Sequence, residues 1–98
     1  MIEATAQIHI LYVSLFIGQS HSLKDKRMVL KSIKDKVRHQ FNVSIAEIDG
    51  LDKWQVATLA FAAIGTDGRR MDTVLQNILE LVRGYHEVEV CEHHIERC

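Results

Sequence analysis

The spacing of hydrophobic residues divides the chain into six segments, some strand-like and some helical. Four segments carry the alternation or the short apolar run of a β-strand: residues 6–17, 42–49, 54–65 and 87–96. Two others repeat their apolar side chains every three or four positions, as an α-helix does: residues 22–41 and a helix that begins at Thr66 or Asp67 and stops at Gly84. The predicted order is therefore βαββαβ.

This order restricts the fold. Two crossover helices must pack on one face of a four-stranded sheet if both crossovers are right-handed. The prediction is an α+β fold, the ferredoxin-like plait, with strand order 4-1-3-2 and a single domain over residues 1–98. Ser22 with Asp25 three positions later predicts the start of the first helix. A phase change at Ala46–Glu47 predicts a β-bulge in the second strand.

Alternation gives each central strand two distinct faces. The stronger apolar set is expected to face the helices: Leu11, Val13, Leu15, Ile17, Leu59 and Phe61. The other face has no helix, yet it is apolar enough to need a cover. We expect a second copy of the chain to pack there, sheet against sheet, with the alternative of one modest exposed patch on a monomer. The predicted homodimer interface consists of Tyr12, Phe16, Val56, Ala60 and Ile64.

The first helix carries a second stripe, which is basic. We call it the basic face and define it as Lys24, Arg27, Lys31, Lys34 and Arg38. These side chains fall within an arc of roughly 80° and extend over roughly 21 Å. Such a stripe is typical of a surface that follows the phosphates of a nucleic acid.

Two less specific interpretations of the basic face stay open. Long basic side chains often only cover apolar surface while their charges remain in water. Alternatively, the fold brings Glu47 and Asp49 close to the start of the first helix, where they would pair with Lys24, Lys26 and Arg27. The second half of the stripe, from Lys31 to Arg38, has no obvious partner.

Composition limits the choice of partners only slightly. The formal net charge is −1, but residues 20–40 hold seven Lys or Arg against two Asp, a local charge of +5. The chain has 47% hydrophobic and 26% charged residues, as expected of a soluble globular protein. No apolar run approaches the roughly 20 residues of a membrane span, and no secretory signal is present. We expect a cytoplasmic protein that does not enter a membrane.

The sequence shows no pattern typical of a catalytic or metal site. Potential metal ligands gather near the C-terminus but match no standard zinc spacing, so no metal and no cofactor is predicted: Cys91, His93, His94, Glu96 and Cys98. The short turn Gly18-Gln19-Ser20 is not a phosphate-binding loop and holds no Arg. Base stacking on the sheet is not expected, because residues 54–65 lack the RNA-recognition pattern. We predict no enzymatic activity, with a phosphate-directed hydrolase as the remaining alternative.

Three blocks occur in a characteristic order: SLKDKR at residues 22–27, FNVSIAE at residues 41–47, and Trp54-Gln55. With them the chain resembles the YlxP family of small bacterial proteins over essentially its whole length. The resemblance implies a ferredoxin-like fold and no established enzymatic activity. Genes of this family usually lie beside genes for translation and ribosome-maturation factors, so the resemblance also implies a role near RNA or the ribosome. It assigns no functional residues.

Two functions from different classes follow. The leading hypothesis is a non-enzymatic protein that binds RNA or a ribosomal particle through the basic face of the first helix. The alternative is a dimeric protein-interaction or small-ligand regulatory module that uses the open face of the sheet.

Overall fold

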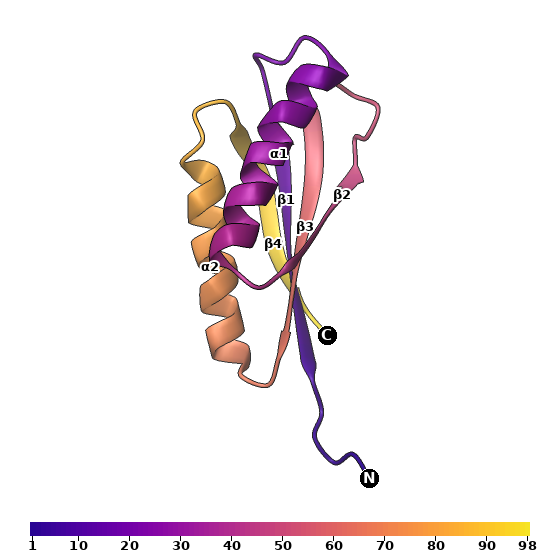
Figure 1. Ribbon diagram of the computed structural model, residues 1–98, viewed down its shortest axis with the longest axis vertical. Coiled ribbons are helices and arrows are strands. Elements are labelled where there is room, and N and C mark those ends of the chain that lie inside the picture. Colours follow the sequence, from indigo (N-terminus) through magenta and orange to yellow (C-terminus); the bar gives the residue numbers. More distant parts are fainter.

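The computed structural model describes residues 1–98 and contains four strands and two helices (Figure 1). In chain order these are β1 Gln7–Phe16, α1 Leu23–Gln40, β2 Ser44–Asp49, β3 Val56–Gly65, α2 Gly68–Arg83 and β4 Glu89–Arg97. All six predicted elements are present, and most are one or two residues shorter than the hydrophobic pattern suggested.

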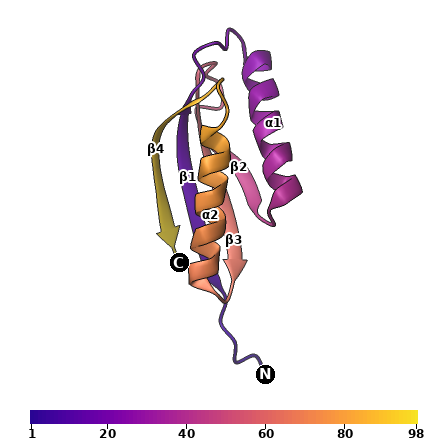
Figure 2. The same ribbon diagram turned by 90° about the vertical axis from the view of Figure 1, so that its left-hand side faces the viewer.

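The strands form one antiparallel sheet in the order β2-β3-β1-β4. Counted from the opposite edge, this order reads 4-1-3-2. Both helices lie on the same side of the sheet and leave its other side bare, as the two views show (Figures 1 and 2). The protein thus has the predicted α+β ferredoxin-like arrangement.

The core lies between the helices and the face of the sheet that the sequence assigned to it. On β1 and the residue after it, Leu11, Val13, Leu15 and Ile17 are all at most 1% exposed. They meet buried residues of β3, α1 and α2: Ala57, Leu59, Phe61, Ala63, Leu30, Ile33, Val37, Met71, Leu75, Ile78, Leu79 and Val82. The opposite residues of β1 and β3 are half-buried or exposed, so the two faces were identified correctly.

Both helices begin at side-chain caps. The Ser22 hydroxyl accepts a hydrogen bond from the Asp25 backbone N–H at 3.0 Å, and the Asp25 carboxylate accepts one from the His21 N–H at 3.0 Å. At α2 the Asp67 carboxylate accepts a bond from the Arg70 N–H at 3.1 Å. These contacts satisfy N–H groups that have no partner inside a helix. The cap predicted at Ser22 is confirmed, and Asp67 is the cap of α2.

The predicted irregularity of β2 is present, but its position was wrong. The register shifts between Glu47 and Asp49 and not at Ala46–Glu47. Glu47 therefore stays opposite Leu59 on the helix side of the sheet, whereas Asp49 lies opposite Thr58 on the open side. This placement lets Glu47 reach a buried cation of α1.

Candidate nucleic-acid interface

The basic face lies along α1, and most of it is open to solvent. Lys24, Arg27, Lys31 and Arg38 are exposed, and Lys34 is half-buried. All but Lys24 line one shallow hollow of about 170 Å³ between α1 and β2. Asp35 and Glu47 also border this hollow. The α1 periodicity thus brings the predicted residues together on a single surface.

Lys26, which does not belong to the basic face, is the cation that the nearby acid neutralises. Its side chain is buried, and its ammonium lies 2.7 Å from the Glu47 carboxylate. It also donates to the backbone carbonyls of Gly50 at 2.5 Å and Lys53 at 2.8 Å. A buried ammonium is tolerated only with such a complete set of partners. This contact ties the start of α1 to the loop between β2 and β3.

Of the three cations expected to pair with Glu47 and Asp49, Lys26 does pair with Glu47, so that part of the interpretation is confirmed. The pairing expected for Lys24 and Arg27 is wrong. Lys26 occupies Glu47, and the Asp49 carboxylate instead accepts a hydrogen bond from the Gly50 N–H at 2.8 Å. The register shift after Glu47 turns Asp49 to the other side of the sheet. The first half of the basic face keeps its charge available.

The expectation for Lys31 is also wrong, because it does have a partner. Its ammonium lies 2.6 Å from the Asp35 carboxylate, one helical turn further on. Both side chains are well exposed, and surface pairs of this kind contribute only about 0.3–0.5 kcal/mol. No carboxylate lies within 4.0 Å of the other four cations: Lys24, Arg27, Lys34 and Arg38.

The open face of the sheet carries the residues predicted for a dimer. Ile64 is 71% exposed, Phe16 39% and Val56 38%, while Tyr12 and Ala60 are half-buried. The register of β1 with β4 adds three polar residues to this face, next to Ile10, Tyr12 and Ser14: Glu96, His94 and Glu92. The edge of the open face at β4 is therefore acidic.

Tyr12 and His94 form the centre of that edge. Their rings stack with centroids 4.8 Å apart. Partial burial raises the pKa of Tyr12, and the nearby Glu96 carboxylate raises it further. Arg97 is the one Lys or Arg in the four strands, and its side chain bonds to Asp72 of α2. No strand thus contributes a cation to the open face.

A partly buried polar network that sequence reasoning missed joins β1, α2 and β4. His9 is 3% exposed, and its Nδ1 lies 2.8 Å from the Asp72 carboxylate. The Arg97 guanidinium donates to the other oxygen of Asp72 at 2.8 and 3.1 Å. The bond from Arg97 holds the pKa of Asp72 below its ordinary value, with a smaller contribution from His9, against the opposing effect of burial. His9 shares the parity of Leu11 and Val13, which was the available signal.

The C-terminal group of Cys and His residues is spread over both faces of β4. His93 contacts the Arg83 guanidinium at 3.0 Å on the helix side, whereas His94 lies against Tyr12 on the open side. Cys91 and Cys98 are free, exposed thiols. No three His, Cys, Asp or Glu side chains come together in a way that could hold a metal ion.

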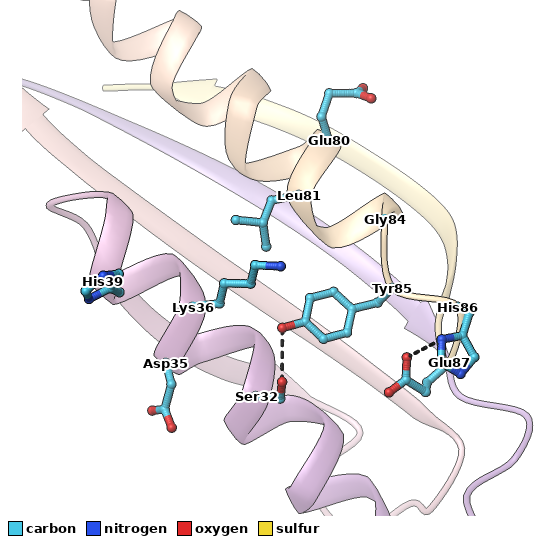
Figure 3. Close-up of a pocket in the computed structure, with 10 residues that line it drawn as sticks. All are labelled: Ser32, Asp35, Lys36, His39, Glu80, Leu81, Gly84, Tyr85, His86 and Glu87. Atoms are coloured by element: carbon cyan, nitrogen blue, oxygen red, sulfur yellow. Dashed lines mark hydrogen bonds and ion pairs between the residues drawn. The ribbon is translucent and has the colours of Figure 1, made fainter.

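The largest hollow is a polar groove of about 900 Å³ between α1 and the C-terminal end of α2 (Figure 3). The Tyr85 hydroxyl lies 3.0 Å from the Ser32 hydroxyl, and the Lys36 ammonium lies 5.6 Å from the centre of the Tyr85 ring. Both acidic and basic side chains line the groove, so it does not favour a ligand of either charge: Asp35, Glu80, Glu87, Lys36, His39 and His86. Its hydroxyl pair links α1 to the segment that follows α2.

Neither helix has the combination of length and apolarity that crossing a membrane requires.

Comparisons with solved structures support the fold alone. The designed protein Foldit4 superposes with a TM-score of 0.53 at 13% identity, covering 94% of this chain and 96% of its own. The crystal structure of MupZ from Pseudomonas fluorescens gives a TM-score of 0.54 at 11% identity, covering 97% of this chain and 71% of its own.

The sequence comparisons identify the family. A curated relative, the "Uncharacterized protein YlxP" of Bacillus subtilis (strain 168), is 40% identical over 73 residues, which are 74% of this chain and 79% of the relative. Residues 8–95 match the family described as "Protein of unknown function (DUF503)". The match spans all but the edges of the fold, from the second residue of β1 to the seventh residue of β4. The chain therefore belongs to the DUF503 family and is YlxP-like.

Proposed function

We propose that the protein acts by binding, without catalysis, and that its basic face holds the phosphate backbone of RNA, free or in a ribosomal particle. One observation carries this proposal: four cations on one face of α1 have no acidic partner, although Asp35 and Glu47 border the same hollow as three of them. Unpaired Lys and Arg groups in a row bind phosphates with little regard to sequence.

The neighbouring ion pairs strengthen the proposal. Lys26 engages Glu47 from inside the fold, and Lys31 engages Asp35 along the helix. Both acids next to the basic face are thereby neutralised without consuming Lys24, Arg27, Lys34 or Arg38. A phosphate chain that approaches α1 then meets a surface whose net charge is positive.

The proposal predicts a definite salt dependence. With about four phosphate contacts on single-stranded RNA, the slope of log K against log salt is about −3, and affinity falls about 50-fold between 50 and 200 mM salt. Binding can be measured by the fluorescence anisotropy of a labelled oligo(U) of 20 nucleotides. Removing two contacts with Arg27→Glu plus Arg38→Glu should make the slope shallower by about 1.4 and weaken binding to all sequences alike.

A matched control separates the local effect from a change of total charge. Arg69 and Arg70 are exposed, have no carboxylate partner and lie at the start of α2. Arg69→Glu plus Arg70→Glu changes the net charge by the same amount but should retain RNA binding. If both double variants lose affinity equally, or if the unmodified protein shows no salt-dependent binding, the proposed function is refuted.

A second proposal concerns the open face of the sheet, which we infer to be covered by a second copy of the chain. The supporting observation is the exposure of Ile64, Phe16 and Val56 on a face that no helix shields. Four strands about 4.8 Å apart and about 3.4 Å per residue give this face an area of about 600 Å². That area equals the lower limit for one partner in a stable protein interface, about 600 Å².

Charge restricts how two copies can meet. Glu92 and Glu96 of β4 would face their own equivalents if the two-fold axis ran perpendicular to the strands. An axis along the strands instead places β4 over β2, whose open side carries Asp49 as well as Ser44 and Ala46, so that Glu92 would face Asp49 of the other copy. Both axes bring carboxylates together, and we propose the dimer without assigning its axis. Light scattering at tens of micromolar should report a dimer, and a monomer would refute the proposal.

A further inference from the structure

The loop between β2 and β3 exposes apolar side chains although its backbone is firmly held. Leu51 is 62% exposed and Trp54 55%. The buried Lys26 ammonium binds the carbonyls of Gly50 and Lys53, and the Lys53 N–H donates to Gly50 at 2.9 Å. Gly50 has a positive φ of 76°, and a Cβ there would lie 2.9 Å from the Val56 carbonyl. Only glycine fits this turn without strain.

Trp54 is also fixed on its C-terminal side. The next residue, Gln55, accepts a hydrogen bond from the Ile17 N–H at 2.7 Å through its backbone carbonyl. Its side-chain amide donates to the Gly18 carbonyl at 3.1 Å. Trp54 therefore sits between two anchored neighbours, Lys53 and Gln55, and its backbone has little freedom to lose when a ligand binds.

The fold does not use Trp54 for its own packing. Its side chain is absent from both the buried core and the partly buried residues that pack against it. The loop next to it is nevertheless held by a buried lysine, an arrangement that is costly in desolvation. A large aromatic side chain that is left in water, on a backbone whose neighbours are anchored, is typical of a binding residue.

The position of the loop connects Trp54 with the basic face. Lys26 lies between Lys24 and Arg27 in the first turns of α1, and its bonds hold the loop against that end of the helix. Figure 1 shows the loop between β2 and β3 at the same end of the molecule as the start of α1. Lys53, which is exposed, adds another cation beside Trp54. These two residues border a hollow of about 410 Å³ together with Asp52, Gln55 and Val56, so one carboxylate accompanies the cation there.

We infer that Trp54 is a stacking residue for a base of single-stranded RNA, placed at the end of the basic face where α1 begins. This inference rests on the proposed function and refines it. The phosphates follow the cations of α1, and one unpaired base near that end stacks on the indole ring. Any base has the aromatic face that stacking needs, so the site selects single strands over duplexes without reading sequence.

The chain offers a direct probe, because Trp54 is its single tryptophan. Titration with an oligo(U) of 12 nucleotides should quench and shift the intrinsic fluorescence, and an RNA duplex of the same length should do so only weakly. Trp54→Ala should weaken oligo(U) binding by about 5- to 150-fold, since stacking on an aromatic side chain contributes on the order of 1–3 kcal/mol per base. Trp54→Phe should recover part of the affinity.

Two controls distinguish stacking from damage to the surface. Leu51→Ala removes the other exposed apolar group of the loop and should leave oligo(U) affinity within about two-fold. The slope of log K against log salt should be the same in Trp54→Ala as in the unmodified protein, because no phosphate contact is lost. Thermal unfolding of both variants should match that of the unmodified protein.

The outcomes separate the two claims. Salt-dependent RNA binding with unchanged tryptophan fluorescence, or with equal affinity in Trp54→Ala, would overturn the stacking inference and keep the proposed function. Equal quenching by duplex and single strand would overturn it too. Absence of any RNA binding by the unmodified protein would overturn both. In that case a protein partner would be the next ligand to test at Trp54.

Discussion

The outer face of α1 and the open face of the sheet lie on opposite sides of the molecule and differ in almost every property. The first presents four cations without acidic partners, whereas the second presents apolar side chains beside an acidic edge and no cation from any strand. A polyanion suits only the first surface, and an apolar partner suits only the second. Under the two proposals, one small domain carries two independent binding surfaces.

Because the sheet separates the two surfaces, both can be occupied together. Two copies joined through their open faces would each keep α1 on the outside, as the one-sided placement of the helices requires (Figure 2). RNA binding should then depend strongly on salt, while dimer formation should depend on it weakly. Variants that affect one surface and spare the other test this separation.

The largest effect is expected at Lys26, the one cation of early α1 that belongs to the interior. Lys26→Met leaves the Glu47 carboxylate without its partner, and loss of one member of a buried pair costs about 3–5 kcal/mol. Chemical denaturation should therefore show a free energy of unfolding that is lower by about 3 kcal/mol. Lys24→Met, two positions away on the exposed side, should change it by less than about 0.5 kcal/mol.

A second variant tests whether the loss comes from the unpaired Glu47 carboxylate. Lys26→Met combined with Glu47→Leu removes both charges and should recover much of the lost stability. If Lys26→Met alone were as stable as the unmodified protein, the buried pair would have no structural importance. The distinction between an inner and an outer set of cations on α1 would then fail.

The next largest effect concerns the open face. Phe16→Glu should weaken the proposed dimer by about 2 kcal/mol or more, because it buries a charge at an apolar interface. Sedimentation velocity at tens of micromolar should then detect mainly monomers. RNA affinity per chain should change little in the same variant. Loss of RNA binding together with the dimer would show that the two surfaces are coupled.

The elements and the core could be read from the sequence because periodicity reports directly which face is buried. The alternation from Leu11 to Ile17 survives in the structure, since each of these side chains has a fixed side of the sheet. The buried lysine also left a signal. Lys26 falls between Leu23 and Leu30 on the apolar side of α1, at the same three- and four-residue steps. A charge on that stripe predicts an internal partner.

The pairing of charges could be foreseen only in part. Lys31 and Asp35 are four positions apart on one helix, so their contact was readable from the sequence. The assignment of Glu47 to Lys26 depends on where the register of β2 shifts, which hydrophobic spacing locates only to within a residue or two. The network of His9 with Asp72 and Arg97 joins three elements distant in sequence, and only the tertiary fold brings them together.

Removing the helix cap at Ser22, next to the start of the basic face, should have a moderate effect on stability. Ser22→Ala removes the acceptor for the Asp25 N–H and should lower the free energy of unfolding by about 1 kcal/mol. Ser22→Thr, which keeps the hydroxyl, should retain most of the stability. Thermal melts of the three proteins give the comparison, and equal melting temperatures would show that the cap is dispensable.

The smallest effect is expected at Asp72, which holds β4 and with it the acidic edge of the open face. The pKa of this carboxyl lies below its ordinary value of 3.8, chiefly because Arg97 bonds to the ionised form. A lowered pKa in the folded state means that ionised Asp72 stabilises the fold above about pH 4. This contribution is lost as the pH falls through the lowered pKa.

Asp72→Asn should therefore cost less than about 1 kcal/mol at pH 7, since the pair is partly exposed. The stabilities of the variant and the unmodified protein should converge as the pH is lowered from 5 toward 2, because the unmodified carboxyl then becomes neutral as well. Urea denaturation at several pH values measures this difference. A gap that stays constant with pH would mean that the charge of Asp72 does not stabilise the fold. RNA affinity should be the same in both proteins, since the substitution lies on the far helix from the basic face.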